Sequence, residues 1–501
     1  MKKDPRPAML LPPTPRLLRG LRSALAELDT TGRPDLVHCV KMIDIVAGHL
    51  LLREDLEPYP PLYADLLALV GEGDRYLPAA SAEVRQRLQQ AASGLAVDLP
   101  VDRGFDIVQG SIAEALACLR DRLALAVAAG GEEATGYIRR VQAAEYRFYA
   151  ANYRPIPTSA TSVPPTLTRE AFEPYLLDRF PGRYRKVPKF QRLVGGFQKE
   201  TIMVDAELAN GSLEALVVRA EKHDRFVKLT ASEIVDEYAI VRRVFEQGIT
   251  VAEPLWLEDD PSRLGRRFMV SRRAAGRNTG DATGNSGAFT PTLTRSLVET
   301  LARIHTLPID ETLAATPLGR WLAYPRMPDN TREEIRTWRH QIWMDRAPPS
   351  PAHQRLFDWL EANVPPDEEP LCLLHNDYGP HNILVDGDRV AAVLDWEVPR
   401  IGDPAEDLSF FLQCCGSGID RDEALRLHRE LSGHKITEFR LRYYDVLSCG
   451  KVLMSGLSAT TMYQATDPAL IDWCQMPILW FGMFHQHVEE KIAAAEAARG
   501  R

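Results

Sequence analysis

Three oxygen-bearing side chains in one stretch of the sequence could carry out phosphoryl transfer. In LLHNDYGPHNILVDGDRVAAVLDWEVPRIGDPAEDLSFF, residues 373–411, His375 is followed by Asp377 and then by Asn382, and Asp395 ends an apolar run. Phosphoryl transfer needs a carboxylate that accepts the proton of the attacking hydroxyl, and oxygen ligands that hold magnesium against the phosphates. Asp377 suits the first role, and Asn382 and Asp395 suit the second.

The spacing of these residues predicts that they meet. Gly379 and Pro380 let the chain turn before Asn382. Two β-like runs around the turn 386–388 predict a hairpin that brings Asp395 back beside that asparagine. The alternative is a surface loop with scattered acids, because a chain with 12 histidines will contain some His-x-Asp sequences by chance. The predicted hairpin, which ends in Leu-Asp-Trp-Glu, favours a phosphoryl-transfer site over this surface loop.

The elements around this stretch are short β-like runs followed by long helical patterns. Apolar runs at 190–194, 201–204, 213–218 and 267–271 surround an amphipathic helix over about 231–247. Helical patterns dominate after residue 276. We therefore predict an α+β fold with a two-lobed, protein kinase-like domain. Its N-lobe, residues 169–276, would hold a small antiparallel sheet, and its C-lobe, residues 277–501, would be mostly helical.

The N-terminal part of the chain is helical throughout. Apolar residues such as Ile112 and Leu116 recur at helical spacing, and the glycine pair 130–131 ends one helix. Residues 1–150 are predicted to form an all-α bundle of about five helices with a structural or docking role, since no paired acids or glycine loop marks a site there. Residues 151–168, rich in Pro, Ser and Thr, are predicted to be an exposed linker.

The composition narrows the function classes. With 501 residues, of which 45% are hydrophobic and 26% charged, the chain is typical of a globular protein with two or three domains. The net charge of -9 gives no general basic field, so we expect no nucleic acid and no membrane among its partners. No apolar run reaches bilayer length, and the seven cysteines lack CxxC or zinc spacing, which favours reduced thiols and a cytoplasmic location.

The acidic stretch resembles the signature of the aminoglycoside phosphotransferase superfamily, which shares the protein kinase-like fold. The resemblance covers about residues 175–490. It implies that Asp377 is the catalytic base, that Asn382 and Asp395 bind Mg²⁺, and that His375 braces the loop through hydrogen bonds. ATP would be the phosphate donor, and a small molecule with a hydroxyl group would be the acceptor.

A second match lies at residues 401–408, IGDPAEDL, which resemble the helix start after the family's metal-binding aspartate. Asp403 is a good N-cap, and Pro404 suits the first helical position. By resemblance Asp407, one turn inside this helix, would anchor the catalytic loop. The alternative for this residue is an ordinary solvated acid in the first turn.

The nucleotide-binding residues implied by the resemblance lie in the N-lobe. Residues 193–201, LVGGFQKET, resemble the nucleotide loop, in which Gly195 and Gly196 would let backbone amides approach phosphate; a plain hairpin turn is the alternative. On the next strand, Arg219 stands where a kinase has the lysine that grips the phosphates, and it would serve both catalysis and nucleotide binding. Its predicted partner on the following helix is Glu237.

Other residues compete for these roles if the register is shifted. They are Glu233 for the helix acid and Lys222 or Lys228 for the cation. Residues 267–276 resemble the strand and hinge that join the two lobes. The backbone of this segment, including Met269 and Ser271, would meet the adenine of the nucleotide.

A closer resemblance concerns the acceptor. Residues 390–404, Arg219, residues 431–437 and the tyrosine pair 443–444 look like the subfamily fused to, or working with, acyl-CoA dehydrogenases. Members of that subfamily phosphorylate the hydroxyl of hydroxyacyl-CoA thioesters, so a hydroxyacyl-CoA or a related hydroxy acid is the expected acceptor. The expected protein partner is an acyl-CoA-metabolising enzyme or a second copy of the chain. The apolar region 473–484 gives little support to a polycationic acceptor.

Two other functions stay open from the sequence. An antibiotic kinase, acting on an aminoglycoside or a macrolide, or a small-alcohol kinase would use the same three residues on a different acceptor. A pseudokinase or scaffold is a different class, and Arg219 in place of the lysine supports it. The set Asp377, Asn382 and Asp395 argues against this class, because a non-catalytic fold has no need for a base together with two metal ligands.

Overall fold

The computed structural model divides the chain into two compact units. It describes residues 17, 56–151, 167–193, 199–221, 232–280, 289–345, 350–367, 369–465 and 487–499. The first unit comprises residues 1–162, 335–363 and 449–494, and the second comprises residues 163–334, 364–448 and 495–501. The four-part division expected from the sequence stays a prediction.

All the regular secondary structure in the described part of the first unit is helical. Its elements are α3 (Tyr59–Gly73), η1 (Asp74–Ala79), α4 (Ala82–Ser93), η2 (Val101–Arg103), α5 (Phe105–Ala129), α6 (Gly131–Ala151) and α13 (Pro351–Ala362). The predicted helix through Ile112 and Leu116 is α5, and both side chains are fully buried. This helix ends before Gly130, whose φ of 67° few other residues adopt. Residues of α12 (Met327–Asp345), α16 (Glu438–Ala465) and α18 (Val488–Ala498) are divided between the two units.

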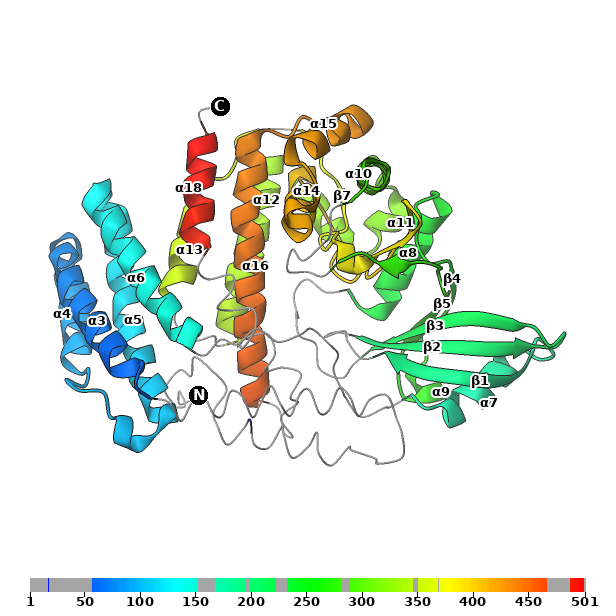
Figure 1. Cartoon of the computed structure of the whole chain (residues 1–501), viewed down its shortest axis with the longest axis horizontal. Helices are drawn as coiled ribbons and strands as arrows, with labels where there is room; N and C mark the ends of the chain where they lie inside the picture. The colour runs from blue at the N-terminus through cyan, green and yellow to red at the C-terminus, as the bar shows by residue number, and fades with distance from the viewer. Residues whose placement is uncertain are drawn as a thin grey trace. The chain divides into compact units, whose positions relative to one another are not determined.

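The second unit begins with α7 (Arg169–Arg179) and a five-stranded antiparallel sheet, drawn in green in Figure 1. The strands are β1 (Tyr184–Leu193), β2 (Lys199–Leu208), β3 (Leu213–Glu221), β4 (Pro254–Glu258) and β5 (Phe268–Arg272), in the order β1-β2-β3-β5-β4. Alternate residues of β3, such as Leu216 and Val218, are fully buried in a core shared with α7. Because side chains alternate along a strand, Arg219 lies on the opposite face of the sheet.

The sequence predictions for this sheet are largely confirmed. Four of the five strands and the helix between them, α8 (Ile234–Glu246), occur where β-like runs and an amphipathic stripe were expected. β4 was not predicted, because it is short and begins at Pro254. It lies at the edge of the sheet, the position where a proline is tolerated in a strand.

The remainder of the second unit is mostly helical and contains two small sheets. Its helical elements are α9 (Pro261–Leu264), α10 (Pro291–His305), α11 (Glu311–Ala314), η3 (Pro317–Ala323), η4 (Pro380–Asn382), α14 (Pro404–Cys415), η5 (Gly416–Gly418) and α15 (Arg421–Ser432). Its strands are β6 (Arg277–Asn278), β7 (Cys372–Leu374), β8 (Ile383–Asp386), β9 (Arg389–Val393) and β10 (Arg400–Gly402). The strand orders are β10-β7 and β6-β8-β9. The predicted α+β class, with a helical N-terminal region, is therefore confirmed.

None of the helices in the described part of the chain combines the length and the apolar character that a bilayer-spanning helix needs.

Candidate active site

The loop after β7 is held by the imidazole of His375. Its Nδ1 atom accepts a hydrogen bond from the backbone N–H of Asp377 at 3.3 Å. With Nδ1 acting as an acceptor, Nε2 carries the proton and donates to the backbone oxygen of Leu394 at 2.9 Å. His375 is fully buried and packs edge-on against Trp396. This histidine therefore connects the loop to the end of β9, as the resemblance implied.

Asp407 anchors the same loop from α14. Its carboxylate accepts hydrogen bonds from the backbone amides of His375, at 2.7 Å, and Asn376, at 2.6 Å. It is fully buried, so the solvated alternative is wrong. Asn376 has a φ of 66°, a conformation that is uncommon outside glycine and that these hydrogen bonds hold in place. The predicted N-cap is also present, because Asp403 accepts from the backbone N–H of Ala405.

Asp377 lies next to Asn382 across the turn. The Nδ2 atom of Asn382 donates to the Oδ2 atom of Asp377 at 2.8 Å and to its backbone oxygen at 3.1 Å. The other carboxylate oxygen, Oδ1, lies 3.2 Å from Nε2 of His381. The carboxylate of Asp377 is about one-third exposed, at 32%, so it can meet a substrate.

The predicted hairpin brings Asp395 back to Asn382. Strands β8 and β9 pair from Ile383 opposite Val393, and the backbone N–H of Leu394 donates to the backbone oxygen of Asn382 at 2.7 Å. Asp395 then leaves the strand with a φ of 63°. The three oxygen-bearing side chains predicted from the sequence thus come from one turn and from the end of the hairpin that follows it.

A cluster of buried charges joins the sheet to Asp395. The guanidinium of Arg219 lies 2.7 Å from Asp395 and 3.1 Å from Glu237. The ammonium of Lys199 lies 2.7 Å from the other oxygen of Glu237 and 3.7 Å from Glu397. Of the two acids considered from the sequence, Glu237 is therefore the one that contacts Arg219.

This cluster holds more carboxylates than cations, and its pKa values reflect the imbalance. Burial, and then the charge of Asp395, raise the pKa of Glu397 to about 8. Burial also acts to raise the pKa of Asp395, but Arg219 and Lys199 outweigh it and lower the pKa below its usual value. Asp395 is thus ionised.

The donor atoms around Asp395 fit a magnesium ion. Because the Nδ2 atom of Asn382 is used in hydrogen bonds to Asp377, its Oδ1 atom is the donor that remains for a metal. Mg²⁺ prefers such oxygen ligands and keeps several waters, so few protein ligands suffice. In the described ranges, no three His, Cys, Asp or Glu residues are grouped so that they could hold a metal ion by themselves.

The other predicted nucleotide residues lie partly outside the described residues. Gly195 and Gly196 lie outside the described residues, as do the competing cations Lys222 and Lys228. Met269 and Ser271 are buried on β5, and Met269 pairs directly with Arg219 across the sheet.

Sequence reasoning missed three residues of the site: Lys199, Glu397 and His381. Lys199 directly follows the glycine loop, and Glu397 belongs to the Asp-Trp-Glu sequence. Their positions next to those motifs were the available signals.

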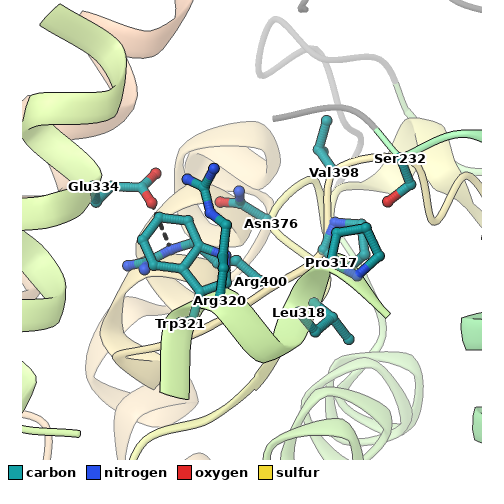
Figure 2. A pocket seen from close by; sticks show the side chains of 10 residues that line it. Ser232, Pro317, Leu318, Arg320, Trp321, Glu334, Asn376, Val398 and Arg400 are labelled. Carbon is teal, nitrogen blue, oxygen red and sulfur yellow. Dashed lines mark ion pairs between the residues drawn. The ribbon is translucent and has the colours of Figure 1, made fainter. Parts of the chain in front are cut away.

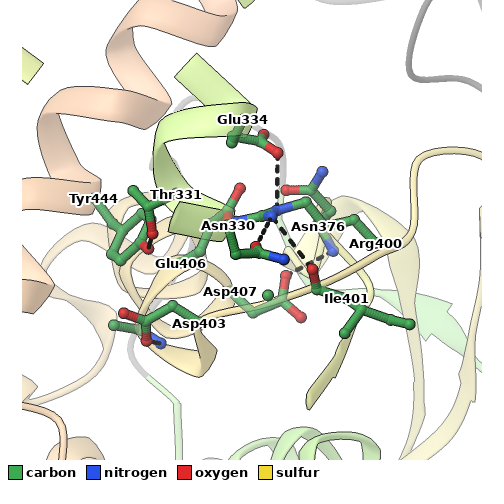
Figure 3. A network of polar contacts seen from close by, with 12 residues as sticks. Asn330, Thr331, Glu334, Asn376, Arg400, Ile401, Asp403, Glu406, Asp407 and Tyr444 are labelled. Carbon is green, nitrogen blue, oxygen red and sulfur yellow. Dashed lines mark hydrogen bonds and ion pairs between the residues drawn. The ribbon is translucent and has the colours of Figure 1, made fainter. Parts of the chain in front are cut away.

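A second buried network supports the loop from behind. Arg400, on β10, lies 3.0 Å from the carboxylate of Glu334 and donates to Glu406 at 2.8 Å and to Asn330 at 2.8 Å. Figure 3 shows Arg400 between these groups, with Asn376 and Asp407 beside it. All three charged side chains are at most 4% exposed. Fully paired buried charges of this kind fix one arrangement of the elements that carry them.

Comparison with known proteins agrees with this geometry. Residues 205–442 match the Phosphotransferase enzyme family. The chain is 32% identical over 203 residues to acyl-CoA dehydrogenase family member 11 of Gallus gallus, a match that covers 40% of this chain and 25% of that protein. It is 32% identical over 185 residues to the Homo sapiens protein of the same name, covering 36% and 23%. The match thus spans about a quarter of the length of these relatives.

Two solved phosphotransferase structures match part of this chain. The macrolide 2'-phosphotransferase of Brachybacterium faecium is 19% identical, with a TM-score of 0.44, and the match covers 65% of this chain and 97% of that one. A spectinomycin phosphotransferase, solved with ADP and spectinomycin, is 15% identical, also with a TM-score of 0.44, and the match covers 64% and 98%.

Proposed function

Since residues 205–442 match the Phosphotransferase enzyme family, we propose that the chain transfers the γ-phosphoryl group of ATP to the hydroxyl of a hydroxyacyl-CoA or a related hydroxy acid. The observation that carries the proposal is the convergence of Asp377, Asn382 and Asp395 at one turn and hairpin. A carboxylate next to two metal-type oxygen donors is what this chemistry needs.

Asp377 is the base in the proposed reaction. Its carboxylate accepts a hydrogen bond from the acceptor hydroxyl and takes the proton as the oxygen attacks the γ-phosphorus in line. The new oxygen–phosphorus bond forms while the bond to the β,γ-bridging oxygen breaks, and ADP leaves with that electron pair. Asn382 keeps the carboxylate oriented through its 2.8 Å hydrogen bond.

The proposed metal ligands are Asp395 and the amide oxygen of Asn382. When bound, Mg²⁺ would neutralise phosphate charge, which lowers the barrier to transfer. His375 holds the backbone on both sides of the site, because it contacts Asp377 and the residue before Asp395.

The sheet would provide the nucleotide side of the site. Arg219 and Lys199 would offset phosphate charge, and Glu237 contacts both of them. Gly195 and Gly196 are proposed to cover the phosphates. Met269 and Ser271 on β5 are proposed to mark the adenine side of the site. Their backbone pairs with β3 and β4, so any contact with adenine would come from their side chains.

The acceptor class is supported by the names of the relatives. They are acyl-CoA dehydrogenase family members. The loop and the hairpin lie within residues 205–442, the region that matches the Phosphotransferase enzyme family. An acyl-CoA-metabolising enzyme is accordingly the proposed partner, and the cytoplasm remains the proposed location.

An acceptor panel tests this function. ADP release with Mg²⁺–ATP would be measured for 4-hydroxypentanoyl-CoA, 4-hydroxypentanoate, kanamycin and a macrolide, with phosphorus NMR of the products. We expect a phosphoester on the hydroxyacyl compounds. Phosphorylation of the antibiotics alone would reassign the protein as an antibiotic kinase. Magnesium-dependent nucleotide binding without transfer to any hydroxyl would favour the pseudokinase.

A further inference from the structure

A cavity opens beside the catalytic loop, in the second unit. The space in and in front of it measures about 470 Å³, a volume that includes open solvent at its mouth. Its walls come from η3, from the segment 398–400 after Asp395, and from Asn376, the residue before Asp377 (Figure 2). Asn376 places the cavity wall one residue along the chain from the proposed base.

The cavity has an apolar floor and a cationic wall. Trp321 is 4% exposed and lies with other apolar residues, namely Pro317, Leu318, Val398 and Pro399. The guanidinium of Arg320 lies 4.3 Å from the centre of the Trp321 ring, and that of Arg400 lies 4.9 Å from it. Figure 2 shows both arginines against this indole. Stacking on an aromatic ring orients a guanidinium and leaves its N–H edges directed outward.

The two arginines differ in their surroundings. Arg400 is 2% exposed and is paired with the buried carboxylates of Glu334 and Glu406, so its charge is neutralised within the fold. Arg320 is exposed, and it lies on the cavity wall. The lining residues include two arginines and one glutamate, Glu334. A polycationic acceptor would therefore meet the guanidinium of Arg320, which has its own sign of charge, whereas an anion would be attracted to that group.

We propose that this cavity is the acceptor subsite and that Arg320 selects an acceptor with a negatively charged group. The apolar floor at Trp321 would take the short carbon chain, the hydroxyl would face Asp377, and Arg320 would bind the anion. The anion is either the carboxylate of a free hydroxy acid or a phosphate of the CoA moiety. This inference rests on the proposed function and adds to it the residue that determines specificity.

The test compares acceptors that differ in charge. Rates with saturating Mg²⁺–ATP would be measured for 4-hydroxypentanoate, its neutral amide and its CoA thioester, with wild type, Arg320→Ala and Arg320→Glu. We expect Arg320→Ala to raise KM for the anionic acceptor roughly 10- to 100-fold, the usual effect of losing a charge-assisted hydrogen bond. The KM for the neutral amide and the KM for ATP should stay within about twofold of the wild-type values, because neither interaction uses this charge. Arg320→Glu should have a larger effect on the anion.

The arms of the experiment identify the anion. If Arg320 binds the carboxylate, Arg320→Ala should raise KM for the free hydroxy acid. If Arg320 binds a phosphate of CoA, this substitution should instead raise KM for the CoA thioester. Arg429→Ala, an exposed arginine on α15, is the matched control. Equal effects of Arg320→Ala on charged and neutral acceptors would overturn the inference while transfer itself persists. If the wild-type protein transfers phosphate to none of the hydroxyl compounds, the proposed function itself is wrong.

Discussion

The Nε2 atom of His305 lies 3.3 Å from the Oδ2 atom of Asp407, and both side chains are completely buried. The Nδ1 atom of His305 lies 2.8 Å from Nε2 of His428. Since a carboxylate accepts, His305 donates through Nε2 and accepts at Nδ1, so His428 donates through its Nε2. Two neutral histidines, His305 on α10 and His428 on α15, thus extend the hydrogen-bond network by which Asp407 holds the loop after β7.

Protonation of these histidines should destabilise the fold. Burial lowers the pKa of His428 well below its ordinary value of 6.5, and burial also lowers that of His305 despite Asp407. Below pH 6.5 the unfolded chain binds these protons and the folded chain does not. The free energy of unfolding should therefore fall as pH drops, by up to about 1.4 kcal/mol per pH unit for each histidine.

Urea unfolding from pH 8 to pH 5 measures this dependence. His428→Gln keeps a donor for His305 and should flatten the curve below pH 6.5. Parallel curves for wild type and His428→Gln would contradict the assignment.

Replacement of Asp377 tests the base. Asp377→Asn keeps the size of the side chain but removes the proton acceptor, so kcat should fall roughly 10²- to 10⁴-fold. Stabilisation of the protein by Mg²⁺–ATP in a thermal melt should persist, because this residue is not assigned to the nucleotide. Turnover equal to that of wild type would remove Asp377 from its role.

The metal assignment predicts a change in magnesium dependence. Chelation by EDTA should abolish transfer, and Asn382→Ala should raise the Mg²⁺ concentration for half-maximal rate roughly tenfold or more, as loss of one ligand does. Asp386→Ala, on the same hairpin but at its far end, is the control and should behave as wild type. Unchanged magnesium titrations in Asn382→Ala would place the ion elsewhere.

Arg219 should be only partly replaceable by lysine. Its guanidinium reaches Glu237 and Asp395 at once, whereas an ammonium is a single point charge. Arg219→Lys should retain measurable kcat/KM for ATP, and Arg219→Ala should lose roughly 100-fold or more. Arg185→Ala, an exposed arginine of β1, controls for general charge loss. An unaffected Arg219→Ala enzyme would assign the phosphate to Lys199 alone.

The anchor at Asp407 should combine a stability effect with a rate effect. Asp407→Ala leaves the backbone amides of His375 and Asn376 without their acceptor. The free energy of unfolding should fall by about 1–3 kcal/mol for each of these buried donors. Urea unfolding measures that loss. Because Asn376 then loses the contact that holds its φ of 66°, kcat should fall while KM for ATP changes little. A purely structural residue would lower stability and leave kcat per folded molecule intact.

The sequence predicted the parts of the site that depend on local spacing. The hairpin follows from the turn at 386–388 between two β-like runs, and the N-cap follows from Asp403 before a proline. The resemblance put Arg219 on the strand that begins at residue 213, and the residue lies on β3.

The parts that were missed depend on contacts between distant segments. Lys199 meets Glu397 only after the sheet and the hairpin have folded, and His305 meets His428 across 123 residues of chain. No local pattern encodes such pairings. The register of β3 against β5 likewise needed the structure to set Met269 opposite Arg219.

The turn of the β8–β9 hairpin lies at the end away from Asn382 and Asp395. Gly387, with a φ of 57°, has open space where a side chain would be, and Asp386 and Asp388 on either side of it complete the turn. A fluorophore attached to the side chain in the variant Asp388→Cys would therefore lie at the turn of the hairpin whose other end carries Asn382 and Asp395. It could report occupancy of the candidate active site by ATP without touching any group that binds it.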